Sequence, residues 1–157
     1  FLKDKKNFFI LSCDCFGSFE KKQFVKFLKK KKSDVVLFGF KITNLQKKLS
    51  NAHTSIKIHK NKIKSINVKK ISLNHNELGH AGFFWVRNQE IFNYLSKFIL
   101  KIKFKREVLL DDYFKFLFDK KLCKVDFYRL KEYVHIGSVQ EFRELKYWEN
   151  YFKNENL

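Results

Sequence analysis

The fold is decided by the stretch FFILSCDCFG, residues 8–17. An apolar run this short, bounded by turn signals, predicts a fully buried strand of a parallel sheet. Asp14 then lies at the carboxyl end of that strand, where open α/β sheets bind their ligands. A carboxylate in this place is either a ligand for a metal or a hydroxyl group, or a cap for the next helix. The stretch alone leaves both roles open.

The segments that follow predict a βαβ unit. After the strand at 8–13, Phe24, Phe27 and Leu28 have helical spacing within 20–32, and 34–41 is a second apolar strand. Connections of this kind are almost always right-handed, so we expect the two strands to run parallel in one sheet.

The rest of the chain alternates between strand and helix patterns. The expected elements are a hairpin of 54–58 and 62–68, a strand at 82–86, helices at 89–102 and 107–119, and strands near 125–130 and 133–137. A last helix is expected to begin at a capping box formed by Ser138 and Glu141 and to end at Phe152. Its side chains Phe142, Leu145 and Trp148 are expected to face the core. This order predicts an α/β fold, a mixed and mainly parallel sheet with flanking helices, in a single domain over 1–157.

Composition restricts the function classes. The net charge of +18 comes from 34 basic and 16 acidic residues in 157, which would suit a nucleic-acid or anionic-membrane partner. However, nearly all the basic residues are Lys spread along the chain, a pattern typical of AT-rich genomes, so a composition bias is favoured. No apolar stretch approaches the ~20 residues of a membrane span, and no signal peptide is visible. We therefore expect a soluble, cytoplasmic protein.

The cysteines and histidines do not by themselves predict a metal site. The chain has three Cys and five His, without Cys-x-x-Cys or Cys/His zinc spacing. The cysteines Cys13, Cys15 and Cys123 are expected to be small buried hydrophobic residues in a reducing compartment. Asp111 and Asp112 form an adjacent acidic pair on a predicted helix, where at most one can face a site and a solvated face is the favoured interpretation.

Four segments, in order, resemble the nucleotidyltransferase family that joins a nucleoside triphosphate to a sugar phosphate or a similar phosphorylated alcohol. Segment 9–14 resembles the family's central strand, which ends in a magnesium-binding Asp, and segment 62–70 resembles the hairpin strand that reaches a lysine contacting the sugar phosphate. Segment 82–85 resembles the Gly-aromatic strand that lines the sugar pocket, and segment 133–148 resembles the closing Asp-x-Gly-Thr motif and its helix. The resemblance implies a Rossmann-like sheet related to that of GT-A glycosyltransferases.

The resemblance also implies roles for individual residues. Asp14 becomes the catalytic Mg²⁺ ligand, Lys69 a contact to the acceptor phosphate, and Gly82 a close approach to the substrate. His135 falls where the family has its second metal carboxylate and could still touch a phosphate. The alternatives are a helix cap for Asp14, a solvated Lys69, a Gly82 that only fits a turn, and a structural His135.

Two departures from the family pattern matter. No Gly-rich triphosphate loop precedes residue 8, and the sequence does not begin with Met, so we expect an N-terminally truncated chain that is inactive alone. His135 replaces the second metal-binding carboxylate of the family, and imidazole is a poor ligand for Mg²⁺. This departure puts the family's two-carboxylate metal site in doubt for this chain.

The expected function is transfer of a nucleoside monophosphate from a nucleoside triphosphate to a sugar phosphate or related acceptor, with release of pyrophosphate, for surface-polysaccharide precursors. Two alternatives stay open. One is a basic nucleic-acid-binding module, which the scarcity of Arg disfavours, and the other is a non-catalytic relative, which His135 favours.

Overall fold

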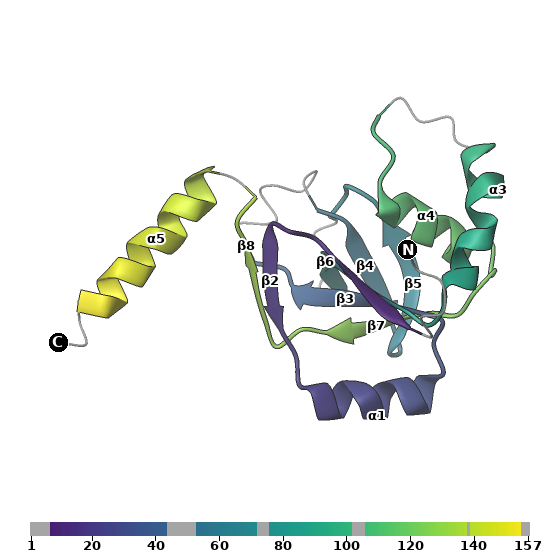
Figure 1. The fold of residues 1–157 in the computed structure, drawn as a ribbon, viewed down its shortest axis with the longest axis horizontal. Helices are drawn as coiled ribbons and strands as arrows, with labels where there is room; N and C mark the ends of the chain where they lie inside the picture. Colours follow the sequence, from purple (N-terminus) through teal and green to yellow (C-terminus); the bar gives the residue numbers. More distant parts are fainter. Residues whose placement is uncertain (1–6, 44–52, 72–75, 102–105, 138, 155–157) are drawn as a thin grey trace.

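The computed structural model describes residues 7–43, 53–71, 76–101, 106–137 and 139–154. Along the chain the elements are β1 (Phe8–Leu11), β2 (Cys15–Ser18), α1 (Lys21–Lys31), β3 (Val35–Lys41), β4 (Ser55–His59), β5 (Lys62–Asn67), β6 (Glu77–Val86), the 3₁₀ helix η1 (Gln89–Tyr94), α3 (Leu95–Ile99), α4 (Leu110–Asp119), β7 (Val125–Arg129), β8 (Glu132–His135) and α5 (Val139–Asn154). The predicted α/β fold with a mixed sheet is confirmed (Figure 1).

The main sheet has the strand order β5-β4-β6-β3-β7, with β1 also paired to β6. Strand β6 is ten residues long, so its first part pairs with β4 and its last part with β1, both antiparallel. Because β3 is also antiparallel to β6, strands β1 and β3 run parallel to each other with β6 between them. Among the described strands only β3 and β7 pair in parallel, so the parallel share of the sheet is smaller than predicted.

Helices cover the two faces of the sheet, and β3 lies between two hydrophobic clusters. Alternate side chains of β3 point to opposite faces, so Leu37 packs with Phe114 of α4 while Phe38 packs with Phe24 of α1. The first six positions of β3 are buried, as expected for a strand covered on both sides.

Strand β1 departs from its prediction as a fully buried parallel strand. Its burial alternates, since Phe8 and Ile10 pack against the core whereas Phe9 is 44% and Leu11 61% exposed. The physical reason is unequal cover on its two faces: Phe8 and Ile10 face the cluster that holds Leu37, whereas Phe9 and Leu11 point to the opposite face. Strand β1 is also antiparallel to β6, its one paired neighbour among the described strands.

The helix predicted over 89–102 begins instead as the 3₁₀ helix η1 and continues as the short α3. The Tyr113 hydroxyl donates a hydrogen bond to the Ile91 carbonyl. The Leu95 N–H bonds to Phe92, three residues back, rather than to Ile91. The Ile91 carbonyl thus has a partner from α4 at the point where an α-helix would offer it to Leu95. Position 102 lies outside the described residues.

The last helix, α5, contradicts the prediction that Phe142, Leu145 and Trp148 face the core. None of its described side chains is buried, and Trp148 is 52% exposed. Figure 1 shows α5 extending away from the sheet, so its aromatic residues mainly contact one another. Ser138, the predicted cap, lies outside the described residues. Over the described part of the chain, no helix has both the length and the apolar character needed to cross a bilayer.

Candidate functional site

A pocket of about 280 Å³ brings together the four residues singled out from the sequence: Asp14, Lys69, Gly82 and His135 all line it. These residues are far apart in the chain and come from the β1–β2 turn, the turn that follows β5, the middle of β6 and the end of β8. We call this cavity the site pocket. Its other lining residues are Ser12, Cys15, His53, Thr54, His80, Ala81, Leu109, Asp111 and Tyr133.

Asp14 is held in the turn between β1 and β2. The Ser12 N–H donates to the Gly82 carbonyl at 3.1 Å, and the Ile136 N–H donates to the Asp14 carbonyl at 2.9 Å. The Ser12 hydroxyl also donates to Asp14 Oδ1, and this bond is the main cause that lowers the pKa of the Asp14 carboxyl. Asp14 is therefore an oriented carboxylate at neutral pH and caps no helix, since α1 begins at Lys21.

Gly82 lies where the pairing of β3 and β6 shifts register, between Leu37 and Gly39 of β3. Its φ of +71° is in the left-handed region, and a Cβ at this position would lie 2.9 Å from the Ser12 Cβ. A β-bulge commonly uses glycine in this way, next to functional sites. In this structure Gly82 allows β6 to approach the residue that orients Asp14.

His135 lies against Asp14 and is fixed from its other side. Its Nδ1 is 2.9 Å from Glu141 Oε1, and its Nε2 is 3.5 Å from Asp14 Oδ2. The His53 ring lies with its centroid 5.2 Å from that of His135. Burial, with the nearby His135 charge second, lowers the pKa of His53. His135 is thus part of a polar network rather than an isolated histidine at a strand end.

Cys15 completes the group around Asp14. Its Sγ lies 3.3 Å from Asp14 Oδ1 and 3.3 Å from the Tyr133 hydroxyl. Burial raises the pKa of the Cys15 thiol to about 11. The prediction of buried cysteines is wrong for Cys13, which is exposed, and Cys15 and Cys123 are half-buried.

The predicted acidic pair on α4 is not a solvated face. Asp111 Oδ1 lies 2.7 Å from His80 Nδ1 in the site pocket, whereas Asp112 pairs with Arg106 at 2.6 Å. Burial alone would raise the pKa of Asp111, but the charge and hydrogen bond of His80 outweigh it and the pKa is lowered. As expected, only one of the two acids faces the pocket.

Lys69 has an exposed side chain at the pocket edge. Its backbone is left-handed, with φ of 52°, and its N–H donates weakly to Thr54 Oγ1 at 3.4 Å. A lysine here presents a mobile positive charge to an anion in the pocket.

The donor set around Asp14 does not fit the predicted Mg²⁺. Among the described residues, one group can offer three metal donors within 4.8 Å of one another: Asp14, Cys15 and His135. This set has one carboxylate, one thiol and one imidazole, whereas Mg²⁺ prefers an octahedral shell of oxygen atoms.

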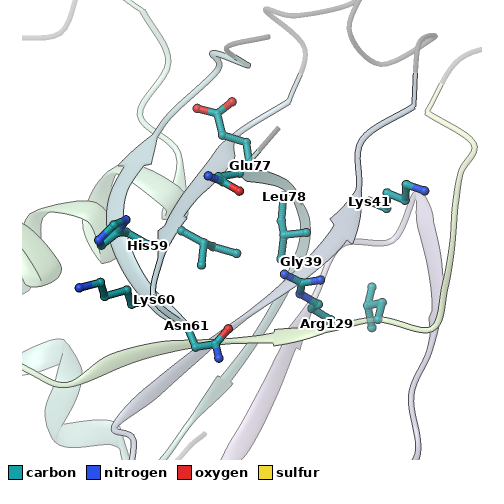
Figure 2. Close-up of a pocket in the computed structure, with 11 residues that line it drawn as sticks. Gly39, Lys41, His59, Lys60, Asn61, Glu77, Leu78 and Arg129 are labelled. Carbon is teal, nitrogen blue, oxygen red and sulfur yellow. The ribbon is translucent and has the colours of Figure 1, made fainter. Parts of the chain in front are cut away.

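A larger cavity of about 540 Å³ lies beside the β4–β5 hairpin and is lined by none of the residues selected from the sequence. We call it the hairpin cavity, and its lining residues are Gly39, Lys41, Ile58, His59, Lys60, Asn61, Asn76, Glu77, Leu78, Arg129 and Leu130. Figure 2 shows Arg129 reaching toward its centre, while the amino groups of Lys41 and Lys60 extend outward. Its polar groups do not converge on one point.

Several site-pocket residues were missed by the sequence analysis. His53, Thr54 and His80 carry no motif, and Tyr133 was noted only as the first residue of the segment 133–148. Glu141, which holds His135 without lining the pocket, was interpreted as part of a capping box. The strand pattern of 133–137 was the one available signal, because alternation places Tyr133 and His135 on one face. The partners on other elements are set by tertiary contacts.

Comparison with known proteins supports the fold. No family model and no curated protein matches the sequence. A putative glucose-1-phosphate thymidylyltransferase from Bacillus anthracis superposes with a TM-score of 0.67 at 12% identity, covering 90% of this chain and 53% of that one. An apo UDP-glucose pyrophosphorylase gives 0.66 at 18% identity, covering 98% and 56%.

A third solved structure, the inositol-1-phosphate CTP transferase from T. maritima, gives a TM-score of 0.60 at 15% identity, covering 88% of this chain and 52% of that one. The chain therefore spans about half the length of these solved structures. At such identities the likeness shows the fold: the chain has the fold of the sugar-phosphate nucleotidyltransferases, as the sequence resemblance predicted.

Proposed function

We propose that the protein is a nucleotidyltransferase that transfers a nucleoside monophosphate from a nucleoside triphosphate to a sugar phosphate or related phosphorylated small molecule. One observation carries the proposal: Asp14, Lys69, Gly82 and His135, chosen from the sequence in family order, line one pocket of a structure with the corresponding fold. The nucleotide-activated product would supply surface-polysaccharide synthesis.

In the proposed reaction, an oxygen of the acceptor phosphate attacks the α-phosphorus of the triphosphate in line. The new P–O bond forms as the bond to the bridging oxygen breaks, and pyrophosphate leaves with that electron pair. Such chemistry depends on positioning and charge neutralisation rather than on covalent steps by the protein. Lys69 would bind the acceptor phosphate as a point charge, and the close β6 backbone at Gly82 would bound the acceptor site.

The test is pyrophosphate release by the full-length natural protein, with each nucleoside triphosphate, a panel of sugar 1-phosphates and inositol 1-phosphate, and divalent cations. The informative variant is Lys69→Gln, and Lys70→Gln is the matched control because Lys70 is the exposed neighbour and does not line the pocket. Loss of a charge-assisted hydrogen bond worth about 1.5–3 kcal/mol should weaken acceptor binding roughly 10- to 100-fold in Lys69→Gln only. No release with any pair of substrates would sink the proposal.

A non-catalytic relative is the second candidate, favoured by the exchange of a family carboxylate for His135. It predicts acceptor binding sensitive to Lys69→Gln, without pyrophosphate release. Retention of nucleic acid that falls steeply with salt, without acceptor binding, would instead support the basic nucleic-acid-binding module.

A further inference from the structure

The donor atoms around Asp14 lie close enough together to surround a single metal ion, with Cys15 beside one carboxylate oxygen and His135 beside the other. Cys15 Sγ lies 3.3 Å from Asp14 Oδ1, and His135 Nε2 lies 3.5 Å from Asp14 Oδ2. Tetrahedral zinc bonds of about 2.0–2.3 Å place neighbouring donors about 3.3–3.7 Å apart. The three donors lie within 4.8 Å of one another without any rearrangement of the backbone.

Strand pairing creates this group. Strands β2 and β8 are antiparallel, and their register places Cys15 directly opposite His135. Opposite side chains of an antiparallel pair lie on the same face, about 4.5–5.5 Å apart at Cβ. The Ile136 N–H bonded to the Asp14 carbonyl closes the end of the pair and brings the Asp14 turn beside it.

The neighbours of the three donors orient them as outer-shell groups do in metal sites. Glu141 Oε1 lies 2.9 Å from His135 Nδ1, which leaves Nε2 directed toward Asp14. A carboxylate that fixes the second nitrogen of a ligating histidine is a recurrent feature of zinc sites. Ser12 holds Asp14 in the same way, through its hydroxyl.

We propose that Asp14, Cys15 and His135 bind one transition-metal ion of the zinc class, with a fourth position open to the site pocket. A thiolate and an imidazole select such ions over Mg²⁺, and three protein ligands with one open position are typical of catalytic rather than structural zinc. The site pocket of about 280 Å³ leaves room for a water or a phosphate oxygen as fourth ligand. Any role of the ion in transfer rests on the proposed function, but its binding rests on the donor geometry alone.

The experiment uses the full-length protein, stripped with a chelator and reloaded with Zn²⁺ or Co²⁺. We expect one equivalent of Zn²⁺ by elemental analysis, and with Co²⁺ a near-ultraviolet thiolate-to-metal charge-transfer band with intense tetrahedral visible bands. Competition with a chromophoric chelator gives the affinity of each variant.

Variants assign the ligands. Cys15→Ser should abolish the charge-transfer band and weaken Zn²⁺ binding more than roughly 100-fold, beyond the usual outer-shell loss. Cys13→Ser, two residues away and exposed, is the matched control and should retain both. Glu141→Gln should weaken binding about 10- to 100-fold without removing the band, as a positioning residue does. His135→Asp should shift preference toward Mg²⁺ and Mn²⁺.

Three results would overturn the site: no Zn²⁺ retained by the folded wild type, a charge-transfer band unchanged in Cys15→Ser, or equal loss in Cys13→Ser. Circular dichroism of each stripped variant separates loss of the site from loss of the fold. Pyrophosphate release supported by Mg²⁺ in a protein that does not bind Zn²⁺ would overturn this inference and leave the proposed function standing. Zn²⁺ binding without transfer would overturn only the function.

Discussion

The site pocket and the hairpin cavity differ in size and in organisation, and the smaller one holds the group of oriented polar side chains. The hairpin cavity has about 540 Å³ and the site pocket about 280 Å³. In the site pocket, the donor atoms of Asp14, Cys15 and His135 lie within 4.8 Å of one another, and hydrogen-bonding contacts with Ser12 and Glu141 orient Asp14 and His135. In the hairpin cavity, Arg129 is exposed, and no hydrogen bond or ion pair joins its side chain to another described residue. Convergence of oriented donors, rather than volume, identifies the candidate site.

The difference arises from how each cavity is built. The site pocket lies where the short β2–β8 pair meets the bulge of β6 at Gly82, so several backbones approach one point. The hairpin cavity lies beside the two-residue turn at Lys60 and Asn61, both left-handed, from which side chains spread outward. Three substitutions, each with its control, test this contrast.

The largest effect on stability is expected for Asp111→Asn in the site pocket. It removes the charged partner of the buried His80, which should lower the free energy of unfolding by about 1.5–3 kcal/mol at pH 7. The folded-state pKa of Asp111 lies below 3.8, so its stabilising contribution is present above pH 3.8 and is lost as pH falls through the folded pKa. Denaturant titrations should therefore show wild type and Asp111→Asn converging in acid.

The control in the hairpin cavity is Arg129→Ala, which should change stability by less than about 0.5 kcal/mol, as exposed substitutions usually do. Equal destabilisation by Arg129→Ala and Asp111→Asn would show that the two cavities are equally organised and would remove the contrast.

A smaller effect is expected from a methyl group on each cavity's glycine. Gly82→Ala forces a left-handed alanine, at a cost of about 1–2 kcal/mol, and pushes on the Ser12 side chain that orients Asp14. Gly39→Ala in the hairpin cavity crowds Leu78, with Cβ at 2.8 Å from its Cδ1, without a left-handed backbone. Both should lower the melting temperature, but only Gly82→Ala should weaken metal and acceptor affinity.

If Gly39→Ala weakened metal or acceptor affinity as much as Gly82→Ala, the coupling of Gly82 to Asp14 through Ser12 would be wrong, and both effects would reflect general loss of stability.

The smallest effect concerns the turn of the hairpin cavity. Lys60 has φ of 47°, and asparagine is several-fold enriched over other non-glycine residues in this region, so Lys60→Asn should stabilise by about 0.5 kcal/mol. Pyrophosphate release should be unchanged because Lys60 does not line the site pocket. Lys62→Asn, at the start of the extended β5, is the control and should give no gain in chemical denaturation.

Much of the local structure could be predicted from periodicity. The β4–β5 hairpin, α1 and the buried β3 agree with the sequence pattern because side-chain alternation and helical spacing are local properties. The α5 prediction failed for a related reason. The apolar residues Phe142, Leu145 and Trp148 indicate an amphipathic helix, but the sequence pattern does not show which part of the protein covers them, and in the structure they are exposed.

The candidate site was predictable only in part. Asp14 could be found because a strand followed by an acid is a local signal, and Lys69, Gly82 and His135 because they follow it in family order. Cys15 was interpreted as a small hydrophobic residue. Its proximity to His135 depends on the pairing of β2 with β8, two strands more than 110 residues apart in the sequence, and no local pattern reports such a pairing. Asp111 and His80 meet through packing of α4 against β6, which no spacing in the sequence reports.

The sequence by itself determined most of the order of strands and helices, though not β2, together with the α/β class and the four residues proposed for the site. These follow from side-chain periodicity and from short motifs. The tertiary structure decided the chemistry available to Asp14. The β2–β8 register, the bulge at Gly82 and the bond from His135 to Glu141 place a thiol and an oriented imidazole beside the carboxylate. Contacts between distant segments depend on backbone pairing in three dimensions. From residues 8–17 the sequence predicted an oxygen ligand at Asp14, and the strand pairing adds the sulfur of Cys15 and a nitrogen of His135 beside it.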